Sequence, residues 1–280
     1  MESLQETEKL IVKQKFEALE AMANVAANAL DMDALGNLGE VANKYDVYDA
    51  GNGGSKFKVV EESDYCGLTG RCCCNPNHEL SLHVFAPSHS PSKEVMFFDR
   101  PCKCGQCCSV CDICRQEMVI SDGNRNQIGY IKQPFLGGGL SPKLQVMDRD
   151  GEEPFATIES DAICCVAGLC CDHTFRLKDE NGQEIGKIVK QKPSSFGELA
   201  TEIVSDADVF AIEFKKDLDE NKKASLFGAL YLIDYMFFEN EGEGNVDLVN
   251  QQCSFKCCDL YCCGCMCPCH CNCGGGQSEE

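Results

Sequence analysis

Short segments in which apolar and polar residues alternate recur between Tyr45 and Phe214. A period of two places successive side chains on opposite faces of a strand, so that one face can be buried. Several segments are separated by turn sequences, among them Asp122-Gly123, Asp150-Gly151 and Asn181-Gly182. The expected strands are KFKVV, ELSLHVF, EVMFF, EMVIS, IGYIKQ, KLQVM, FATIE, TFRLK, IGKIVK and VFAIEF. Many short strands at this spacing predict a β-sandwich or a β-barrel.

An internal repeat with a period of 57 residues supports this interpretation. It aligns Cys107, Cys108, Cys114, Asp122, Asn124, Ile128, Gly129 and Ile131 with Cys164, Cys165, Cys171, Asp179, Asn181, Ile185, Gly186 and Ile188. A looser third copy begins at Cys72-Cys73-Cys74 and continues into the strand ELSLHVF. The repeated unit is a cysteine-rich corner followed by a hairpin. We therefore expect the three cysteine groups to gather at one end of a barrel.

The N-terminal segment, residues 1–42, has the spacing of a helix instead. Ser3 and Glu6 are separated as in a capping box. The apolar residues that follow at intervals of three and four are Val12, Phe16, Leu19, Ala23, Ala26 and Leu30. This pattern predicts a helix over 3–30 that docks on the body of the protein or dimerises loosely.

A second helix is expected over Ala224–Phe238, which is almost unbroken apolar sequence. Its fifteen residues correspond to about 22 Å, which is short of the roughly 30 Å hydrocarbon core of a bilayer. The charged residues at its two ends and within it are Lys222, Lys223, Glu239, Glu241 and Asp234. We therefore predict a buried central helix with Ala224, Gly228, Leu232, Asp234 and Phe238 along it, and not a transmembrane span.

Composition and charge limit the possible partners. The 280 residues carry a net charge of −20 at 44% hydrophobic content, which argues against nucleic-acid binding and against direct attraction to anionic membranes. Membrane attachment would then need a bridging cation or covalent lipid, unless a local basic patch outweighs the overall field. The start MESLQETEKL lacks the features of a secretory signal, so synthesis in the cytosol is expected. There, the 24 cysteines are expected to be metal ligands, acylation sites or buried thiols and not a disulfide framework.

Several motifs in a fixed order show a resemblance to a known family. They are NKYDVYDAG, CCCNPN, FDRPCKCGQCC, RQEMVI, IGYIKQ, the Cys164-Cys165 segment, DADVFAIEF and LIDYMFFE. Over residues 43–240 the chain resembles the phospholipid scramblases of the tubby-like superfamily. The resemblance implies a mainly β fold, a closed antiparallel twelve-stranded tubby-like barrel around one C-terminal hydrophobic helix. Residues 241–280 would form a cysteine-rich, low-complexity tail.

The resemblance also implies a function. It predicts Ca²⁺-responsive, ATP-independent movement of phospholipids in both directions between membrane leaflets, without covalent chemistry. Membrane phospholipids are the expected partners and nucleic acid is not, while self-association of the chain stays open. The expected location is the cytoplasmic face of the plasma membrane, by lipid anchor or a single span. Two other functions stay open, a tubby-like lipid- or protein-binding signalling module without transport, and a cysteine-rich metal-binding protein.

The family's proposed calcium segment aligns with Asp206–Asp217. Candidate calcium ligands are Asp206, Asp208, Asp217 and Asp219. An EF-hand loop needs oxygen at position five and Gly at position six, where this chain has Phe210 and Ala211. Residues 209–214 also alternate as a strand does. An EF-hand loop, a weak acidic rim, and solvated acids that flank a core strand are therefore alternatives.

Cysteines supply the remaining candidate sites. The positions of the family's palmitoylated cluster correspond to Cys102, Cys104, Cys107, Cys108, Cys111 and Cys114. Alternatively, Cys104-x-x-Cys107 and Cys111-x-x-Cys114 have the spacing of a Zn²⁺ site, or the thiols are simply buried. The tail holds ten cysteines between Cys253 and Cys273, which suits metal capture, for example by Cys257, Cys262, Cys265 and His270, multiple acylation, or disorder.

Three lysines, Lys187, Lys190 and Lys192, match the family's nuclear-import segment. A solvated strand face explains them as well. The sequence shows no phosphate-binding loop, Ser-His-Asp pattern or HExxH motif, so no hydrolytic or transferase site is expected.

Overall fold

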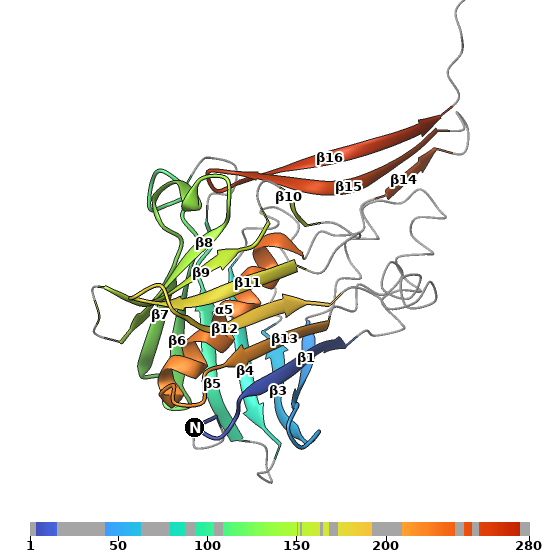
Figure 1. Ribbon diagram of the computed structural model, residues 1–280. Coiled ribbons are helices and arrows are strands. Elements are labelled where there is room, and N and C mark those ends of the chain that lie inside the picture. Colours follow the sequence, from blue (N-terminus) through green and yellow to red (C-terminus); the bar gives the residue numbers. More distant parts are fainter. Residues whose placement is uncertain are drawn as a thin grey trace, which may run out of the picture.

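A closed antiparallel β-barrel of twelve strands forms the body of the protein, as Figure 1 shows for the computed structural model. The structure describes residues 4–15, 43–62, 79–87, 93–103, 109–149, 151, 153–162, 165–167, 173–191, 209–238, 244–247 and 252–274. The barrel strands are β1 (Lys9–Lys15), β2 (Lys44–Asp49), β3 (Ser55–Glu61), β4 (Leu80–Ala86), β5 (Lys93–Arg100), β6 (Glu117–Asp122), β7 (Gln127–Lys132), β8 (Lys143–Asp148), β9 (Pro154–Ser160), β11 (His173–Asp179), β12 (Glu184–Lys190) and β13 (Val209–Phe214). Around the barrel they follow the order β1-β13-β12-β11-β9-β8-β7-β6-β5-β4-β3-β2. All ten segments predicted from alternation are strands of this barrel, so the expected barrel is confirmed.

The prediction of an N-terminal helix over 3–30 is wrong where the structure describes it. Residues 9–15 form β1, which closes the barrel by pairing with β13 through Leu10↔Ile212 and with β2 through Leu10↔Asp49. Leu10 and Val12 are buried in the core. Without β1, the backbone groups at the edges of β2 and β13 would be unpaired, and this long-range pairing outweighs the local helical spacing. Residues 16–30 of the predicted helix lie outside the described residues.

The central helix is confirmed. Helix α5 (Glu220–Phe237) begins after Asp219, whose side chain accepts a hydrogen bond from Asn221 N at 2.9 Å. Figure 1 shows the helix inside the barrel, with strands on several sides. Fourteen of its eighteen residues are buried, which explains why the segment lacks a polar face. In the described part of the chain, no helix is long and apolar enough to cross a membrane.

The sequence repeat has a structural counterpart in two hairpin turns. Asp122 Oδ1 accepts hydrogen bonds from Asn124 N and Asn126 N at 2.8 and 2.9 Å. In the second copy, the Asp179 carboxylate accepts from the backbone N–H groups of Asn181 and Gln183 at 2.9 and 2.8 Å. The residue that ends each turn has a left-handed backbone, with φ of 65° at Arg125 and 76° at Gly182. The repeat is therefore a repeat of hairpin geometry.

The strands that follow the three cysteine groups begin at the same end of the barrel. Strands β4, β6 and β11 run parallel to one another because an odd number of antiparallel strands lies between each pair in the barrel order. We call this end the cysteine end, and the other the far end. Cys72–Cys74, Cys107, Cys108, Cys164 and Cys171 lie outside the described residues, so the gathering of the cysteines themselves stays a prediction.

A second antiparallel sheet is formed mainly by the tail that the sequence analysis treated as low-complexity. Its strands are β10 (Cys165–Ala167), β14 (Gly244–Asp247), β15 (Gln252–Cys262) and β16 (Cys265–Gly274). Strand β15 lies between β10 and β14 and also pairs with β16. In Figure 1 the long β15–β16 hairpin runs past one end of the barrel. The tyrosine near its turn, Tyr261, packs on Phe237 of α5 with ring centroids 5.9 Å apart. This contact places the hairpin turn at the end where α5 finishes.

Candidate functional site

Three segments meet at the cysteine end, and we call them the rim loops. They are residues 109–115, residues 133–141 with the short 3₁₀ helix η2 (Phe135–Gly138), and the hairpin turn 260–265. Backbone hydrogen bonds join all three, from Ser109 N to Cys263 O at 2.9 Å, from Leu136 N to Ser109 O at 2.9 Å and from Cys263 N to Gly139 O at 2.7 Å. The tail hairpin is therefore part of the barrel rim.

A buried tyrosine fixes this junction. The Tyr261 hydroxyl accepts a hydrogen bond from Gln133 Nε2 at 2.9 Å and donates to Gly137 O at 2.7 Å. Ser109 Oγ in turn donates to Gln133 Oε1 at 2.7 Å. Burial raises the pKa of Tyr261, so its hydroxyl keeps the proton that it donates at neutral pH. Sequence reasoning missed Tyr261, Gln133 and Ser109, because no local pattern shows that the tail returns to the barrel.

The network continues into three of the motifs that carry the family resemblance. Arg100 of FDRPC is fully buried and donates from Nε and Nη2 to Gln116 Oε1 at 3.2 and 2.9 Å. Gln116 of RQEMVI donates its backbone N–H to Oε1 of Gln133, from IGYIKQ, at 3.2 Å. Because buried polar groups must be hydrogen-bonded, these motifs have a shared structural role in building the rim.

Two further motifs meet beside the end of α5. Asp234 of LIDYMFF is 4% exposed and accepts a hydrogen bond from Tyr45 Oη of NKYDVYD at 2.9 Å. Tyr235 donates to Glu61 Oε2 at 3.0 Å, and Asn43 Nδ2 donates to the Tyr235 hydroxyl at 3.0 Å. Burial first, and then the Asp234 carboxylate, raise the pKa of Tyr45. The predicted intrahelical acid thus has the polar partner that its burial requires.

Of the candidate acylation cysteines, three are described. Cys102 and Cys111 are exposed. Cys114 is 6% exposed, its sulfur lies 3.1 Å from that of Cys111, and it takes part in a disulfide, which the sequence did not lead us to expect. Cys104, Cys107 and Cys108 lie outside the described residues. Within the described ranges no three His, Cys, Asp or Glu side chains converge as a metal site. Acylation of the other five cysteines therefore stays a prediction. The disulfide at Cys114 contradicts both acylation of that residue and its share in the Zn²⁺ alternative over Cys104, Cys107, Cys111 and Cys114.

The candidate calcium segment contains a barrel strand. Within β13, Phe210 and Ile212 are buried, and a six-residue strand extends about 17 Å from its first Cα to its last. Such a strand cannot wrap one ion, which rules out an EF-hand loop over 206–217. Asp217 and Asp219 are exposed beyond the end of β13, at the far end of the barrel. Asp206 and Asp208 lie outside the described residues, so weak calcium binding stays a prediction.

The lysines of the expected basic run do not form one exposed surface. Lys187 pairs with Glu213 at 3.4 Å. Lys190 is 5% exposed, and its Nζ lies 4.3 Å from the centre of the Phe238 ring. Lys192 lies outside the described residues. The alternative of a solvated strand face therefore holds for Lys187 and is wrong for Lys190, whose ammonium group lies against an aromatic ring in a buried position.

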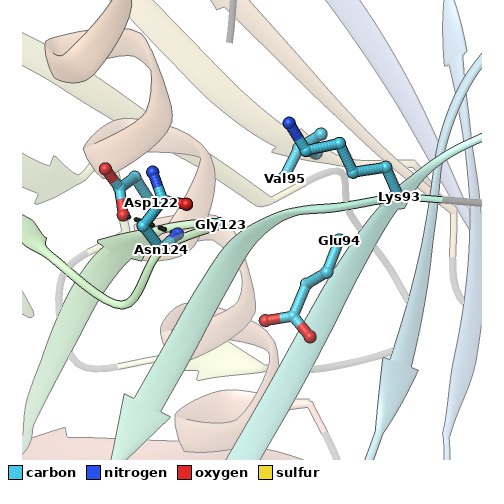
Figure 2. A pocket seen from close by; sticks show the side chains of 6 residues that line it. All are labelled: Lys93, Glu94, Val95, Asp122, Gly123 and Asn124. Carbon is cyan, nitrogen blue, oxygen red and sulfur yellow. Dashed lines mark hydrogen bonds between the residues drawn. The ribbon is translucent and has the colours of Figure 1, made fainter.

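A small depression lies at the far end, between the start of β5 and the β6–β7 turn (Figure 2). It is lined by Lys93, Glu94, Val95, Asp122, Gly123 and Asn124. Figure 2 shows the Asp122 carboxylate turned to the backbone of its own hairpin, with the Glu94 carboxylate directed elsewhere. Burial raises the pKa of Asp122, but hydrogen bonds from Asn126 and Asn124 outweigh it and lower the pKa. Asp122 therefore stabilises its own turn, and Glu94 pairs with Arg125 at 3.1 Å. We assign no ligand to the depression.

Comparison with known proteins covers the barrel and its helix. A family model described as Scramblase matches residues 1–240, which includes β1. Phospholipid scramblase 1 of Mus musculus is 30% identical over 243 residues, 86% of this chain and 64% of that protein. Phospholipid scramblase 1 of Homo sapiens is 29% identical over 86% of this chain and 66% of its own length. Phospholipid scramblase 2 of Bos taurus is 28% identical over 85% of this chain and 71% of its own length.

The chain spans less than two thirds of the mouse protein and of phospholipid scramblase 1 of Rattus norvegicus, at 64% and 63% of their lengths. No solved structure matches the chain. The match to the family model over residues 1–240 shows that the chain belongs to the scramblase family.

Proposed function

We propose that the protein is a phospholipid scramblase that moves phospholipids in both directions between leaflets, without ATP and in response to Ca²⁺. It acts at the cytoplasmic face of the plasma membrane, held there by acyl groups on the cysteines of residues 102–111, and its activity involves no covalent chemistry. Self-association is compatible with this role, and nucleic acid is not a partner. The observation that carries the proposal is the family match over the whole barrel and α5, including the motifs that meet at the rim.

The filled barrel limits how lipid could move. Side chains of α5 such as Phe227, Leu230 and Tyr231 are fully buried inside it, so a polar headgroup has no route through its centre. A lipid path must therefore run outside the barrel, where the protein contacts the bilayer. The same observation favours a second candidate function, a tubby-like module that binds lipid or protein and signals without transport.

Transport separates these two functions. The purified full-length protein, reconstituted in vesicles that carry fluorescent phospholipid in both leaflets, is expected to let an external reductant bleach well over half of the label within minutes when Ca²⁺ is present. In protein-free vesicles, bleaching should stop near one half of the label. Bleaching that stops near one half with the protein present, with and without Ca²⁺, would favour the binding module. Metal analysis of the protein as purified tests the third function, a cysteine-rich metal binder.

The calcium response can be assigned within the same assay. Because β13 separates the two acidic pairs, we compare Asp206→Asn/Asp208→Asn with Asp217→Asn/Asp219→Asn. Asparagine keeps the cap that Asp219 gives α5. Substitution of the pair that binds Ca²⁺ should raise the calcium concentration needed for half-maximal bleaching at least severalfold. If both double variants respond as the wild-type protein does, none of these four acids carries the calcium response.

Membrane attachment is expected to depend on thioester-linked acyl groups, because a net charge of −20 opposes binding to anionic leaflets. Each buried methylene contributes about 0.8 kcal/mol, so two or more acyl chains suffice for stable anchoring. Hydroxylamine should release the protein from isolated cell membranes, and 1 M salt (about ten times ordinary ionic strength) should not. Release by salt but not by hydroxylamine would show that charge holds the protein.

A further inference from the structure

Where the structure describes the chain, the exposed large hydrophobic side chains all belong to the rim loops. Among the described residues, the five large hydrophobic side chains that are exposed are Val110 at 52%, Ile113 at 69%, Phe135 at 61%, Leu140 at 51% and Leu260 at 39%. Two come from residues 109–115, two from residues 133–141 and one from the hairpin turn. Single exposed apolar residues are common on protein surfaces, but their confinement to three joined segments marks an interaction surface.

These side chains stand on a rigid base. A Cβ on Gly137 would lie 2.1 Å from the Tyr261 hydroxyl, and a Cβ on Gly264 would lie 1.8 Å from Ser109 Oγ. Both glycines have positive φ, 59° and 92°, so the loops approach one another as closely as backbone permits. Together with the buried hydrogen bonds of Tyr261, this packing holds the apolar side chains outward and prevents their collapse into the core.

The β15–β16 hairpin extends the same surface. Cross-strand pairing places Leu260 opposite Cys267 and Cys262 opposite Cys265, and alternation puts these four residues on one face. Leu260, Cys262 and Cys267 are exposed. The other face carries Tyr261, which is buried, and Met266, which packs against the core. Because an unmodified cysteine behaves as a small hydrophobe, the outward face continues the apolar surface.

Charge along the chain favours a membrane at this surface. The three rim loops together hold one Asp and one Arg, a net charge of zero, whereas the whole chain carries −20. Beside Ile113, the carboxylate of Asp112 pairs with Arg115 and, at 2.9 Å, with Lys132. The negative charge that would repel an anionic leaflet is therefore concentrated elsewhere in the chain.

We propose that the rim loops and the outward face of the β15–β16 turn form a membrane-docking surface, whose apolar side chains enter the boundary between headgroups and acyl chains of a phospholipid bilayer. This inference rests on the proposed function, because it takes phospholipid as the partner. It requires no acyl group, and it gives the tail a role that the family match, which ends at residue 240, does not include. The contact that the polypeptide makes alone is reversible and too weak to retain the protein on isolated membranes after hydroxylamine treatment. Acyl chains on neighbouring cysteines supply the stable anchor.

The absence of tryptophan from the chain allows a direct test. Phe135→Trp places a single fluorophore on the proposed surface, and Gln127→Trp, at an exposed position at the far end, is the matched control. The full-length, non-acylated protein is mixed with phosphatidylcholine vesicles that contain one fifth phosphatidylserine. Phe135→Trp emission should shift to the blue and be quenched by lipids brominated on the acyl chain, whereas Gln127→Trp should show neither effect. Ile113→Trp provides an independent reporter on another rim loop if Phe135→Trp does not fold.

A loss of binding completes the test. Ile113→Ser/Phe135→Ser removes the two most exposed apolar side chains and should weaken vesicle partitioning at least tenfold. A blue shift that depends on protein concentration, without vesicles and without quenching by brominated lipid, would assign the surface to a second copy of the chain and overturn the inference. Rapid scrambling with Phe135→Trp and Ile113→Trp unquenched would also overturn it. Quenching without scrambling would leave the docking surface intact and contradict the proposed function.

Discussion

Gly228→Leu is expected to unfold the protein. Gly228 lies in the middle of α5, where a Cβ would approach Ile120 Cδ1 to 2.2 Å and Phe98 Cδ1 to 3.6 Å. Both neighbours belong to the core of the surrounding strands and are fully buried. Leucine adds three carbons beyond that Cβ, and a closed barrel cannot move one wall outward without breaking strand pairing. Extra methylenes in a filled core typically cost about 1–3 kcal/mol and occasionally more. Because even the Cβ has no room, all four added carbons must be accommodated by displacing the core, and we expect the cost to reach the total stability of about 5–15 kcal/mol.

Thermal unfolding followed by circular dichroism, together with the soluble fraction on expression, measures this effect. Gly228→Ala should cost less, about 1–2 kcal/mol, because the side chain of Ile120 can rotate away. Asn221→Leu is the matched control, since it adds leucine to an exposed position in the first turn of the same helix. An unchanged melting temperature for Gly228→Leu would show that α5 is not enclosed by the strands.

The strands were predictable because each has its own alternating pattern. Closure of the barrel was not. Leu10 and Val12 are two residues apart, as a strand requires, yet Val12 and Phe16 are also spaced as on a helix. The choice depends on β13, about two hundred residues away in the sequence, whose backbone β1 pairs. No local pattern contains that information. Strand β2 was missed for a related reason, because KYDVYD is short and polar and is identified as a strand only through its pairing with β1 and β3.

The tail did contain a signal of its structure. From Cys265 to Cys273, every second residue is cysteine, and this strict period of two is that of a strand. Its cysteine content drew attention to metal and acyl chemistry instead. The position of the hairpin could not be predicted, because it depends on the hydrogen bonds of Tyr261 with Gln133 and Gly137. For this reason the membrane-docking surface is visible only in the structure.

The two lysines before the apolar helix also looked alike in the sequence, as charges that end an apolar segment. In the structure Lys222 is partly exposed, with Nζ 3.6 Å from Asp148, whereas Lys223 is fully buried. Lys223 Nζ donates to the carbonyl oxygens of Leu4 at 3.3 Å, Gln5 at 2.7 Å, Thr7 at 2.9 Å and Lys216 at 3.3 Å. One ammonium group therefore ties the segment before β1 to the helix at the far end of the barrel.

Lys223→Met is accordingly expected to lower the free energy of unfolding by about 2–4 kcal/mol. Methionine preserves most of the apolar stem, but the carbonyl groups lose a charged donor in a buried site, where each such hydrogen bond contributes about 1.5–3 kcal/mol. The expected loss is smaller than the combined contribution of four separate hydrogen bonds, because burial disfavours the ammonium form and lowers the pKa of Lys223. Lys222→Met, the matched control, removes one partly exposed ion pair and should cost about 1 kcal/mol or less.

Urea unfolding of the wild-type protein and both variants measures the difference, and its pH dependence identifies the cause. Because the pKa of Lys223 is lower in the folded protein than its ordinary value of 10.5, the unfolded chain binds this proton more tightly. The wild-type protein should therefore gain stability relative to Lys223→Met as the pH rises through the folded pKa towards 10.5. In that range the folded protein has released the buried proton while the unfolded chain still binds it. Equal losses for the two variants, with parallel pH profiles, would mean that Lys223 does not hold the N-terminal segment to the helix.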